Sequence, residues 1–207
     1  MALSPSFKNL GELESIHLRQ AVEIYAAAFY DALQFLSTDL DTIADLLEQL
    51  FVPQNHYVAL LGGNVVSVVA YSTFNSRSIA IKREKIVKHL GLFKGLYSYF
   101  RLHKALGKKL NLHIEQLYID SVVTDSAYRG MGIALELQKY LIESLPYKEI
   151  HLEVAQMNFK AIRVYEKMGF AINQHLKERS FWKPNSEGGK LVMSLTKVED
   201  IQLSGKP

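Results

Sequence analysis

The sequence predicts a mixed α+β domain in which strand-like and helix-like runs alternate along the chain. Two β-branched, apolar runs at residues 57–61 and 65–74 flank the turn Gly62-Gly63-Asn64, the pattern of a β-hairpin. A strand, a glycine turn and an amphipathic helix follow one another after Gln116. Two more strand-like runs, residues 171–182 and 190–197, surround a polar turn at residues 184–189.

Size and composition fit one globular domain. The chain has 207 residues, of which 48% are hydrophobic and 22% are charged, as in ordinary globular proteins. We expect a single domain over residues 1–197 and a flexible, polar tail over residues 198–207.

No pattern points to a metal site or a membrane span. The chain has no cysteine, which excludes disulfides, thiolate ligands and a cysteine nucleophile. Its histidines show no i, i+4 pair and no His-x-His spacing, so we expect no metal. The N-terminus lacks the layout of a signal peptide, and the longest apolar stretch, residues 58–71, is interrupted by Gly62-Gly63-Asn64. We therefore expect a cytoplasmic protein without a membrane span.

The first half of the chain contains two predicted helices. Residues 15–30 form the first, with Ile16, Ala27 and the alanine run at residues 26–28 predicted to pack inward. Residues 38–51 form the second, which ends before Pro53.

A strongly basic segment follows the hairpin. Residues 77–110 carry ten Lys and Arg against one acid, Glu84, whereas the net charge of the whole chain is only +3. Apolar residues in this segment recur at helical spacing, at Ile86, Leu90, Phe93, Tyr97 and Phe100. We predict one amphipathic helix here, weakened by Gly91 and Gly95.

The glycine turn at residues 128–134 is typical of a phosphate site. It lies between the predicted strand Gln116–Thr124 and a helix whose apolar residues recur until Pro146. Glycines allow close backbone approach, and the first amides of a helix are free to bind an anion. A P-loop is excluded because Ile133 and Ala134, not Lys and Ser/Thr, follow the glycines. A Rossmann turn is excluded because Leu135 stands where its third glycine or alanine would be.

Two motifs resemble the GNAT acetyltransferase superfamily. Arg129-x-x-Gly132-x-Ala134 matches its Arg/Gln-x-x-Gly-x-Gly/Ala signature. After the strand Glu149–Ala155 comes a helix with Asn158 as its N-cap and Gly169 at its end, and it matches Asn-x-x-Ala-x-x-x-Tyr-x-x-x-Gly-Phe. The resemblance is close over residues 115–195 and loose before them. It implies a mixed, mostly antiparallel sheet of six to seven strands, splayed between the two signature strands and flanked by about four helices. The basic segment, residues 75–113, would be a helical insertion, and a short first strand would lie within residues 7–13.

The resemblance implies transfer of an acetyl group from acetyl-CoA to an amine of a small molecule or peptide by direct attack. The pyrophosphate would bind the amides of the turn, from Arg129, Gly130, Met131 and Gly132 to Ile133 and Ala134. The pantetheine arm would pair with backbone groups at Val122 and Val123. Asn158 can contact the arm, cap its helix, or do both.

Three residues are candidates for the chemistry. Tyr165 stands where the family places a hydroxyl near the departing sulfur; the alternative is a packed core tyrosine. An ammonium acceptor must lose a proton before it attacks, and Asp120 or Glu115 could assist by acceptor binding or water-mediated deprotonation. The alternative for either acid is a hydrogen-bonded or solvated carboxylate.

Other functions remain open at this point. A non-catalytic acyl-CoA-binding module would keep the fold and lose the chemistry. The basic segment alone suggests nucleic acid, which we do not expect because no aromatic platform on a sheet face is recognisable. We predict that the segment forms a partly mobile helical flap over the acceptor side. Its apolar stripe, Leu90, Phe93, Tyr97 and Phe100, would pack against the core, an apolar substrate or a second subunit in a homodimer. The alternative is a helix packed permanently on the core.

Overall fold

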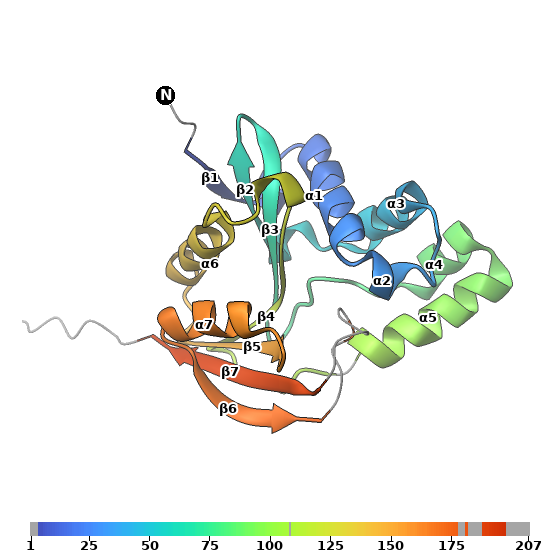
Figure 1. The fold of residues 1–207 in the computed structure, drawn as a ribbon. Helices are drawn as coiled ribbons and strands as arrows, with labels where there is room; N and C mark the ends of the chain where they lie inside the picture. The colour runs from blue at the N-terminus through green and yellow to red at the C-terminus, as the bar shows by residue number, and fades with distance from the viewer. Residues whose placement is uncertain (1–3, 108, 178–180, 182–187, 198–207) are drawn as a thin grey trace, which may run out of the picture.

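A computed structural model describes residues 4–107, 109–177, 181 and 188–197, which build one sheet with helices on both faces (Figure 1). The strand order is β1-β2-β3-β4-β5-β7-β6, and every neighbouring pair is antiparallel except β4 with β5. The strands are β1 Ser6–Asn9, β2 His56–Leu61, β3 Asn64–Ser72, β4 Gln116–Thr124, β5 Glu149–Ala155, β6 Ala171–Leu176 and β7 Lys190–Thr196. The predicted mixed, mostly antiparallel sheet is confirmed. The predicted tail and most of the predicted turn at residues 184–189 lie outside the described residues.

Helices lie on both faces of this sheet. They are α1 Ser15–Ala28, α2 Tyr30–Leu33, α3 Leu40–Leu50, α4 Arg83–Leu90, α5 Leu92–Leu106, α6 Ile133–Ser144 and α7 Phe159–Lys167. Four of them, α1, α3, α6 and α7, are the helices that the sequence predicts around the sheet. Within the described part of the chain, none of the helices is long and apolar enough to cross a membrane.

Two hydrophobic cores fill the space between these helices and the sheet. One lies under α1 and α3 and contains Tyr25 and Leu47; the other lies under α6 and α7 and contains Leu137 and Ile162. Strand β3 contributes to both, because Val68 packs into the first core and the neighbouring Val69 into the second. Strands β2, β3 and β4 are therefore covered by helices on both faces, whereas β6 at the sheet edge is exposed along most of its length.

The predicted inward face of α1 is wrong except at Ala26. Its buried residues are Ala21, Val22, Tyr25 and Ala26, whereas Ile16, Ala27 and Ala28 are exposed. At about 100° per residue, three successive alanines cover more than half of the helix circumference and cannot all face the core. By the same step, Ile16 lies about 180° from Tyr25 around the helix axis. The bulky aromatic residue, not the alanine run, sets the orientation.

The basic segment forms a hairpin of two helices instead of the single helix that the sequence predicts over Ile86 and Phe100. Gly91 has φ +80°, a conformation that ends α4 and redirects the chain into α5. A Cβ on Gly95 would lie 2.6 Å from the Cα of Val87, so only glycine permits this close approach of α5 to α4. Ile86 and Leu102 are buried in the core under α1 and α3. This packing favours an arm fixed to the protein body over a mobile flap.

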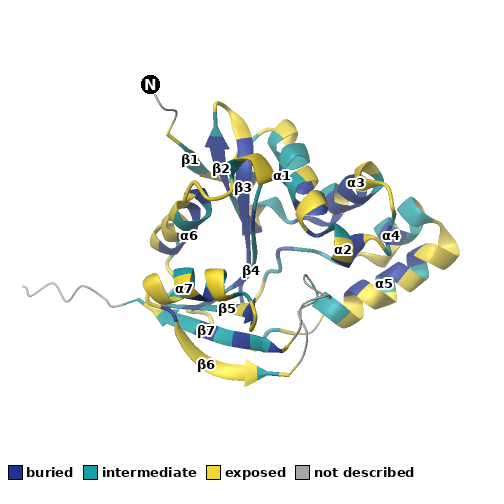
Figure 2. Cartoon of the chain, in the orientation of Figure 1, coloured by how far each residue is buried: buried dark blue, intermediate teal, exposed yellow. Residues whose placement is uncertain are grey.

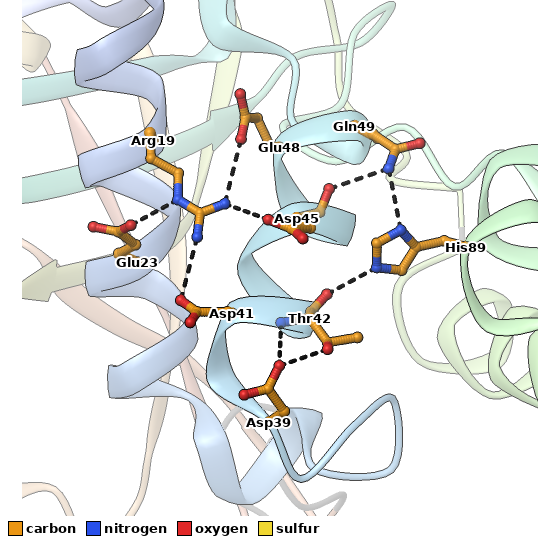
Figure 3. A network of polar contacts seen from close by, with 9 residues as sticks. All are labelled: Arg19, Glu23, Asp39, Asp41, Thr42, Asp45, Glu48, Gln49 and His89. Atoms are coloured by element: carbon orange, nitrogen blue, oxygen red, sulfur yellow. Dashed lines mark hydrogen bonds and ion pairs between the residues drawn. The ribbon is translucent and has the colours of Figure 1, made fainter.

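A polar network holds this arm's neighbours together (Figure 3). Arg19 of α1 contacts four carboxylates, those of Glu23 on α1 and of Asp41, Asp45 and Glu48 on α3. His89 of α4 lies 3.1 Å from the Thr42 carbonyl oxygen and 3.4 Å from the side-chain nitrogen of Gln49, both on α3. The network joins α1 to α3 and α3 to α4. Its directional contacts fix how these helices, which also pack through apolar residues, are oriented.

Candidate active site

The sheet opens between β4 and β5. The two strands pair only from Gln116 with Glu149 to Ile119 with Leu152. Beyond these residues, β4 continues beside β3 alone and β5 continues beside β7 alone. In the described residues, the facing edges of β4 and β5 therefore have no strand partner over their C-terminal halves. This is the splay that the sequence resemblance implies.

A β-bulge at Asp120 accompanies the opening. Ser121 pairs with Ala70 and Ile119 pairs with Tyr71, which leaves Asp120 without a register partner on β3. An extra residue in one strand bends it and reverses the faces that follow. Accordingly, Ile119 packs in the core under α6 and α7, whereas Val123, four residues later, packs in the core under α1 and α3.

The Asp120 carboxylate is partly buried and hydrogen-bonded. The hydroxyls of Ser72 and Ser78 each donate to the same carboxylate oxygen at 2.5 Å. Burial raises the pKa of Asp120, while the two serine hydroxyls and the positive charge of Arg77 lower it by a smaller amount. The predicted candidate thus lies where the two strands separate, with its charge supported by two donors.

A second polar pair lies near this point, and sequence reasoning missed it. Tyr118 of β4 is hydrogen-bonded to Glu153 of β5, and burial followed by the negative charge of Glu153 raises the pKa of Tyr118. Glu153 also forms an ion pair with Lys190 of β7. The only available signal in the sequence was that Tyr118 and Asp120 alternate along β4. The contact of Tyr118 with Glu153 depends on the parallel pairing of β4 with β5, which no local pattern reveals.

The glycine turn presents a row of free backbone amides. Gly130 and Gly132 both have φ +81°, and Gly132 is the N-cap of α6. Upstream, the Asp125 carboxylate accepts from the Ala127 amide at 2.8 Å and fixes the entry to the turn. Among the described residues, none of the six amides from 129 to 134 donates a hydrogen bond. Six free donors at the start of a helix make a fitting site for a diphosphate.

The open edge of β4 offers one residue for strand-like pairing. The Val123 carbonyl accepts from the Ser67 hydroxyl on β3 at 2.8 Å, so the backbone of Val123 points toward β3. Successive residues of a strand point their backbone groups to opposite sides, which directs those of Val122 to the open edge. The Thr124 carbonyl, also on that side, accepts from the Arg129 side chain at 3.1 Å. The geometry therefore favours Val122 over Val123 as a partner for a ligand arm.

Tyr165 lies on the inner side of α7. Its ring packs against Phe170 with centroids 5.7 Å apart, and burial raises the pKa of its hydroxyl to about 12. That hydroxyl has no hydrogen-bond partner within the described part of the chain. At the start of α7, the Asn158 side chain accepts from the Ala161 amide at 3.3 Å, which confirms its predicted capping role. A contact of Asn158 with a ligand stays a prediction.

The structure separates Glu115 from the other candidates. Glu115 precedes β4 at the end where β4 and β5 are still paired, and its exposed carboxylate lies 3.1 Å from the Lys148 amine. Asp120 lies five residues farther along the strand, a distance of about 16 Å. The described residues contain no cluster of three or more His, Cys, Asp or Glu that could hold a metal ion.

Comparisons with known proteins agree with this geometry. The model of the acetyltransferase (GNAT) family matches residues 18–170. A spermine/spermidine N(1)-acetyltransferase of Bacillus subtilis (strain 168) is 32% identical over 65 residues, which span 30% of this chain and 43% of that protein. The chain thus matches less than half the length of this curated relative.

Solved structures show the same fold. An N-acetyltransferase from Staphylococcus aureus Mu50 superimposes with a TM-score of 0.65 at 17% identity, covering 92% of this chain and 100% of that one. A ribosomal-protein-alanine N-acetyltransferase from Brucella melitensis gives a TM-score of 0.58 at 18% identity, covering 93% and 99% of the two chains.

Proposed function

The chain belongs to the GNAT acetyltransferase family, and from this we propose that it transfers an acetyl group from acetyl-CoA to an amine of a small molecule or peptide. The observation that carries the proposal is the row of six free amides at residues 129–134. This row directly follows β4, whose edge toward β5 is unpaired over its C-terminal half. An anion site beside an open strand edge suits a ligand that combines a diphosphate with an extended amide-bearing arm.

The residues present fit acetyl-CoA on chemical grounds. The helix start at Gly132 supplies free N–H groups and the positive end of the α6 dipole, both suited to a diphosphate. A Cβ built on Gly130 or Gly132 would meet no atom within 4 Å, so the turn faces open space. The amide groups of a pantetheine arm match the backbone groups of Val122. Acetyl-CoA supplies the activated acyl group.

We assign Tyr165 the role of proton donor. Its pKa of about 12 keeps the hydroxyl protonated at neutral pH, and the hydroxyl makes no competing hydrogen bond among the described residues. When the amine nitrogen bonds to the acyl carbon and the carbon–sulfur bond breaks, Tyr165 can donate its proton to the sulfur that leaves.

We assign Asp120 the role of proton acceptor. A carboxylate with a raised pKa is a stronger base than an exposed one, and the Ser72 and Ser78 hydroxyls stabilise its ionised form. Glu115, the other predicted acid, is exposed and paired with Lys148. It is therefore a weaker candidate for the proton acceptor than Asp120. Two proton-transfer groups and no nucleophilic cysteine suit direct attack by the amine.

The acceptor is tested by a panel of amines. Polyamines belong in it because of the spermine/spermidine relative, together with peptides and aminoglycosides. Acetyl-CoA is supplied in excess and the freed thiol is measured. We expect release with at least one amine class and slow hydrolysis without an amine. Tight binding of acetyl-CoA with no release for any amine would instead support a non-catalytic acyl-CoA-binding module.

A further inference from the structure

Helix α5 carries aromatic residues on the side that faces away from the protein. Its buried residues, Gly95, Ser98 and Leu102, mark the inner side. At about 100° per residue, Phe93 and Phe100 lie opposite them, with Tyr97 beside them. Their exposed fractions are 88%, 66% and 57%. A surface helix normally presents polar residues there, so this arrangement requires an explanation.

We call Leu92, Phe93, Tyr97 and Phe100 the α5 outer face. Leu92 extends it toward the start of the helix and is also exposed. The Tyr97 ring lies 6.5 Å from that of Phe35 between centroids, and its hydroxyl accepts from the Arg101 guanidinium at 3.2 Å. Helix α5 lies at the outside of the molecule, and exposed residues follow its outer side (Figure 2). Single exposed apolar residues are common, but large ones gathered on one helix face indicate an interaction site.

Exposed cations lie on α5 itself and on α4, the helix that packs against it. Lys94, Arg101 and Lys104 on α5 are exposed, and so are Lys82, Arg83 and Lys88 at the start of α4 and along it. Glu84 is the one acid in residues 77–110. The partner that fits such a face is anionic and accepts aromatic side chains.

Charge argues against a second copy of this chain as the partner. Two copies meeting face to face would bring the same lysines and arginines together and repel each other. Shape argues against a protein that needs a groove, because the aromatic rings project from a convex helix. An anionic lipid surface has neither difficulty, since rings enter the interface while Lys and Arg stay with the headgroups.

We propose that the α5 outer face docks this protein onto the surface of an anionic lipid bilayer. Phe93 and Phe100 lie in the interface, and the exposed cations contact lipid phosphates. The arm can hold the protein at such a surface because Ile86 and Leu102 anchor it in the core. The proposal does not depend on acetyl transfer.

Docking would also orient the proposed active site. The Arg101 guanidinium lies 4.1 Å from the centre of the Phe35 ring, and Phe35 in turn contacts Phe181, which lies between β6 and β7 in sequence. Helix α5 thus adjoins the segment after α2. Helix α5 belongs to the basic segment, which the sequence predicts over the acceptor side, so a docked protein would hold that side near the lipid.

The test is sedimentation of the full chain with vesicles. We expect binding to phosphatidylcholine vesicles that contain phosphatidylglycerol, little binding to phosphatidylcholine alone, and loss of binding as salt rises. The double variant Phe93→Ser/Phe100→Ser should bind at least tenfold more weakly, about 1.4 kcal/mol. Lys94→Glu/Lys104→Glu should also lose binding. The matched controls are Ile16→Ser, exposed on α1, and Lys139→Glu, exposed on α6, which should bind like the unaltered protein.

Three outcomes would overturn the proposal. The first is equal binding to neutral and anionic vesicles. The second is unchanged binding of the folded Phe93→Ser/Phe100→Ser variant. The third is a dimer, measured by light scattering, that dissociates in this variant while vesicles do not bind; the face would then join two copies. Circular dichroism establishes that each variant is folded.

Discussion

Tyr165 and Asp120 are both partly buried, but their polar groups differ in what surrounds them. The Tyr165 hydroxyl has no partner among the described residues, whereas the Asp120 carboxylate accepts from two serine hydroxyls. A tyrosine hydroxyl without a partner in the protein is available to donate to a ligand. A carboxylate that is paired can be retained for structure alone. The two residues therefore need different tests.

Replacing Tyr165 by Phe removes the proton donor and keeps the ring that packs on Phe170. We expect kcat to fall about 10² to 10⁴-fold while the Kd of acetyl-CoA stays within about twofold, because the hydroxyl acts on charge that develops only in the transition state. Thiol release and calorimetry measure the two quantities. Unaltered turnover would leave Tyr165 only its packing role.

Replacing Asp120 by Asn should change how stability depends on pH. The pKa of Asp120 is raised in the folded protein, so the folded state holds this proton more tightly than the unfolded state. Its stabilising effect is therefore present below the ordinary pKa of 3.8 and is lost as pH rises through the folded pKa. Relative to the Asn variant, the unaltered protein should lose free energy of unfolding over this range.

Urea unfolding at several pH values, from about 4 to about 8, checks this expectation. A constant difference between the two proteins would show that the Asp120 pKa is not raised. The same variant should lose most thiol-release activity at all pH values if Asp120 is the proton acceptor. Full activity of the Asp120→Asn variant would assign the residue to the bulge structure only.

At the scale of elements, the turn before α6 and the hairpin before β3 share a backbone conformation. Gly132 has φ +81° and Gly63 has φ +84°, and a Cβ on either residue meets no atom within 4 Å. A β-branched residue is strained at both positions to a similar degree. Only Gly132 belongs to the row of free amides, so the pair separates strain from ligand binding.

Gly132→Val should raise the Kd of acetyl-CoA at least tenfold, about 1.4 kcal/mol, because the side chain occupies the space in front of the amides. Gly63→Val should lose similar stability and bind acetyl-CoA normally. Calorimetry on both folded variants measures the difference. Equal affinities in the two variants would remove the glycine turn from the binding site.

The helical arm formed by α4 and α5 can be tested by hydrogen exchange. Its buried Ile86 and Leu102 and the contact of Gly95 with Val87 predict protected amides in both helices of the free protein. Acetyl-CoA should leave this protection unchanged. Rapid exchange that slows when acetyl-CoA is added would support the mobile flap expected from the sequence and contradict the fixed arm.

At the scale of the whole molecule, local signals predicted well and long-range ones did not. The Gly130 and Gly132 turn and the Asn158 cap depend on residues next to each other, so the sequence alone identified them. The bulge at Asp120 and the contact of Tyr118 with Glu153 depend on strand register, which no single segment specifies. The outward aromatic face of α5 also escaped prediction. Gly91 divides the apolar pattern between two helices, and a periodic pattern does not show which side meets the core.

The short pairing between β4 and β5 also bears on how the protein comes apart. Four register pairs join the two halves of the sheet, whereas β3–β4 and β5–β7 are paired along most of their lengths. Opening four pairs breaks fewer strand pairs than melting either half, so we expect β5, β6 and β7 with α7 to unfold as a separate cooperative unit. Native-state exchange in low denaturant would show these strands opening before β2–β4; simultaneous opening would show one unit. A ligand arm that hydrogen-bonds to the free edges of both β4 and β5 would join the two units. The halves of the sheet would then resist separation only in the complex with the ligand.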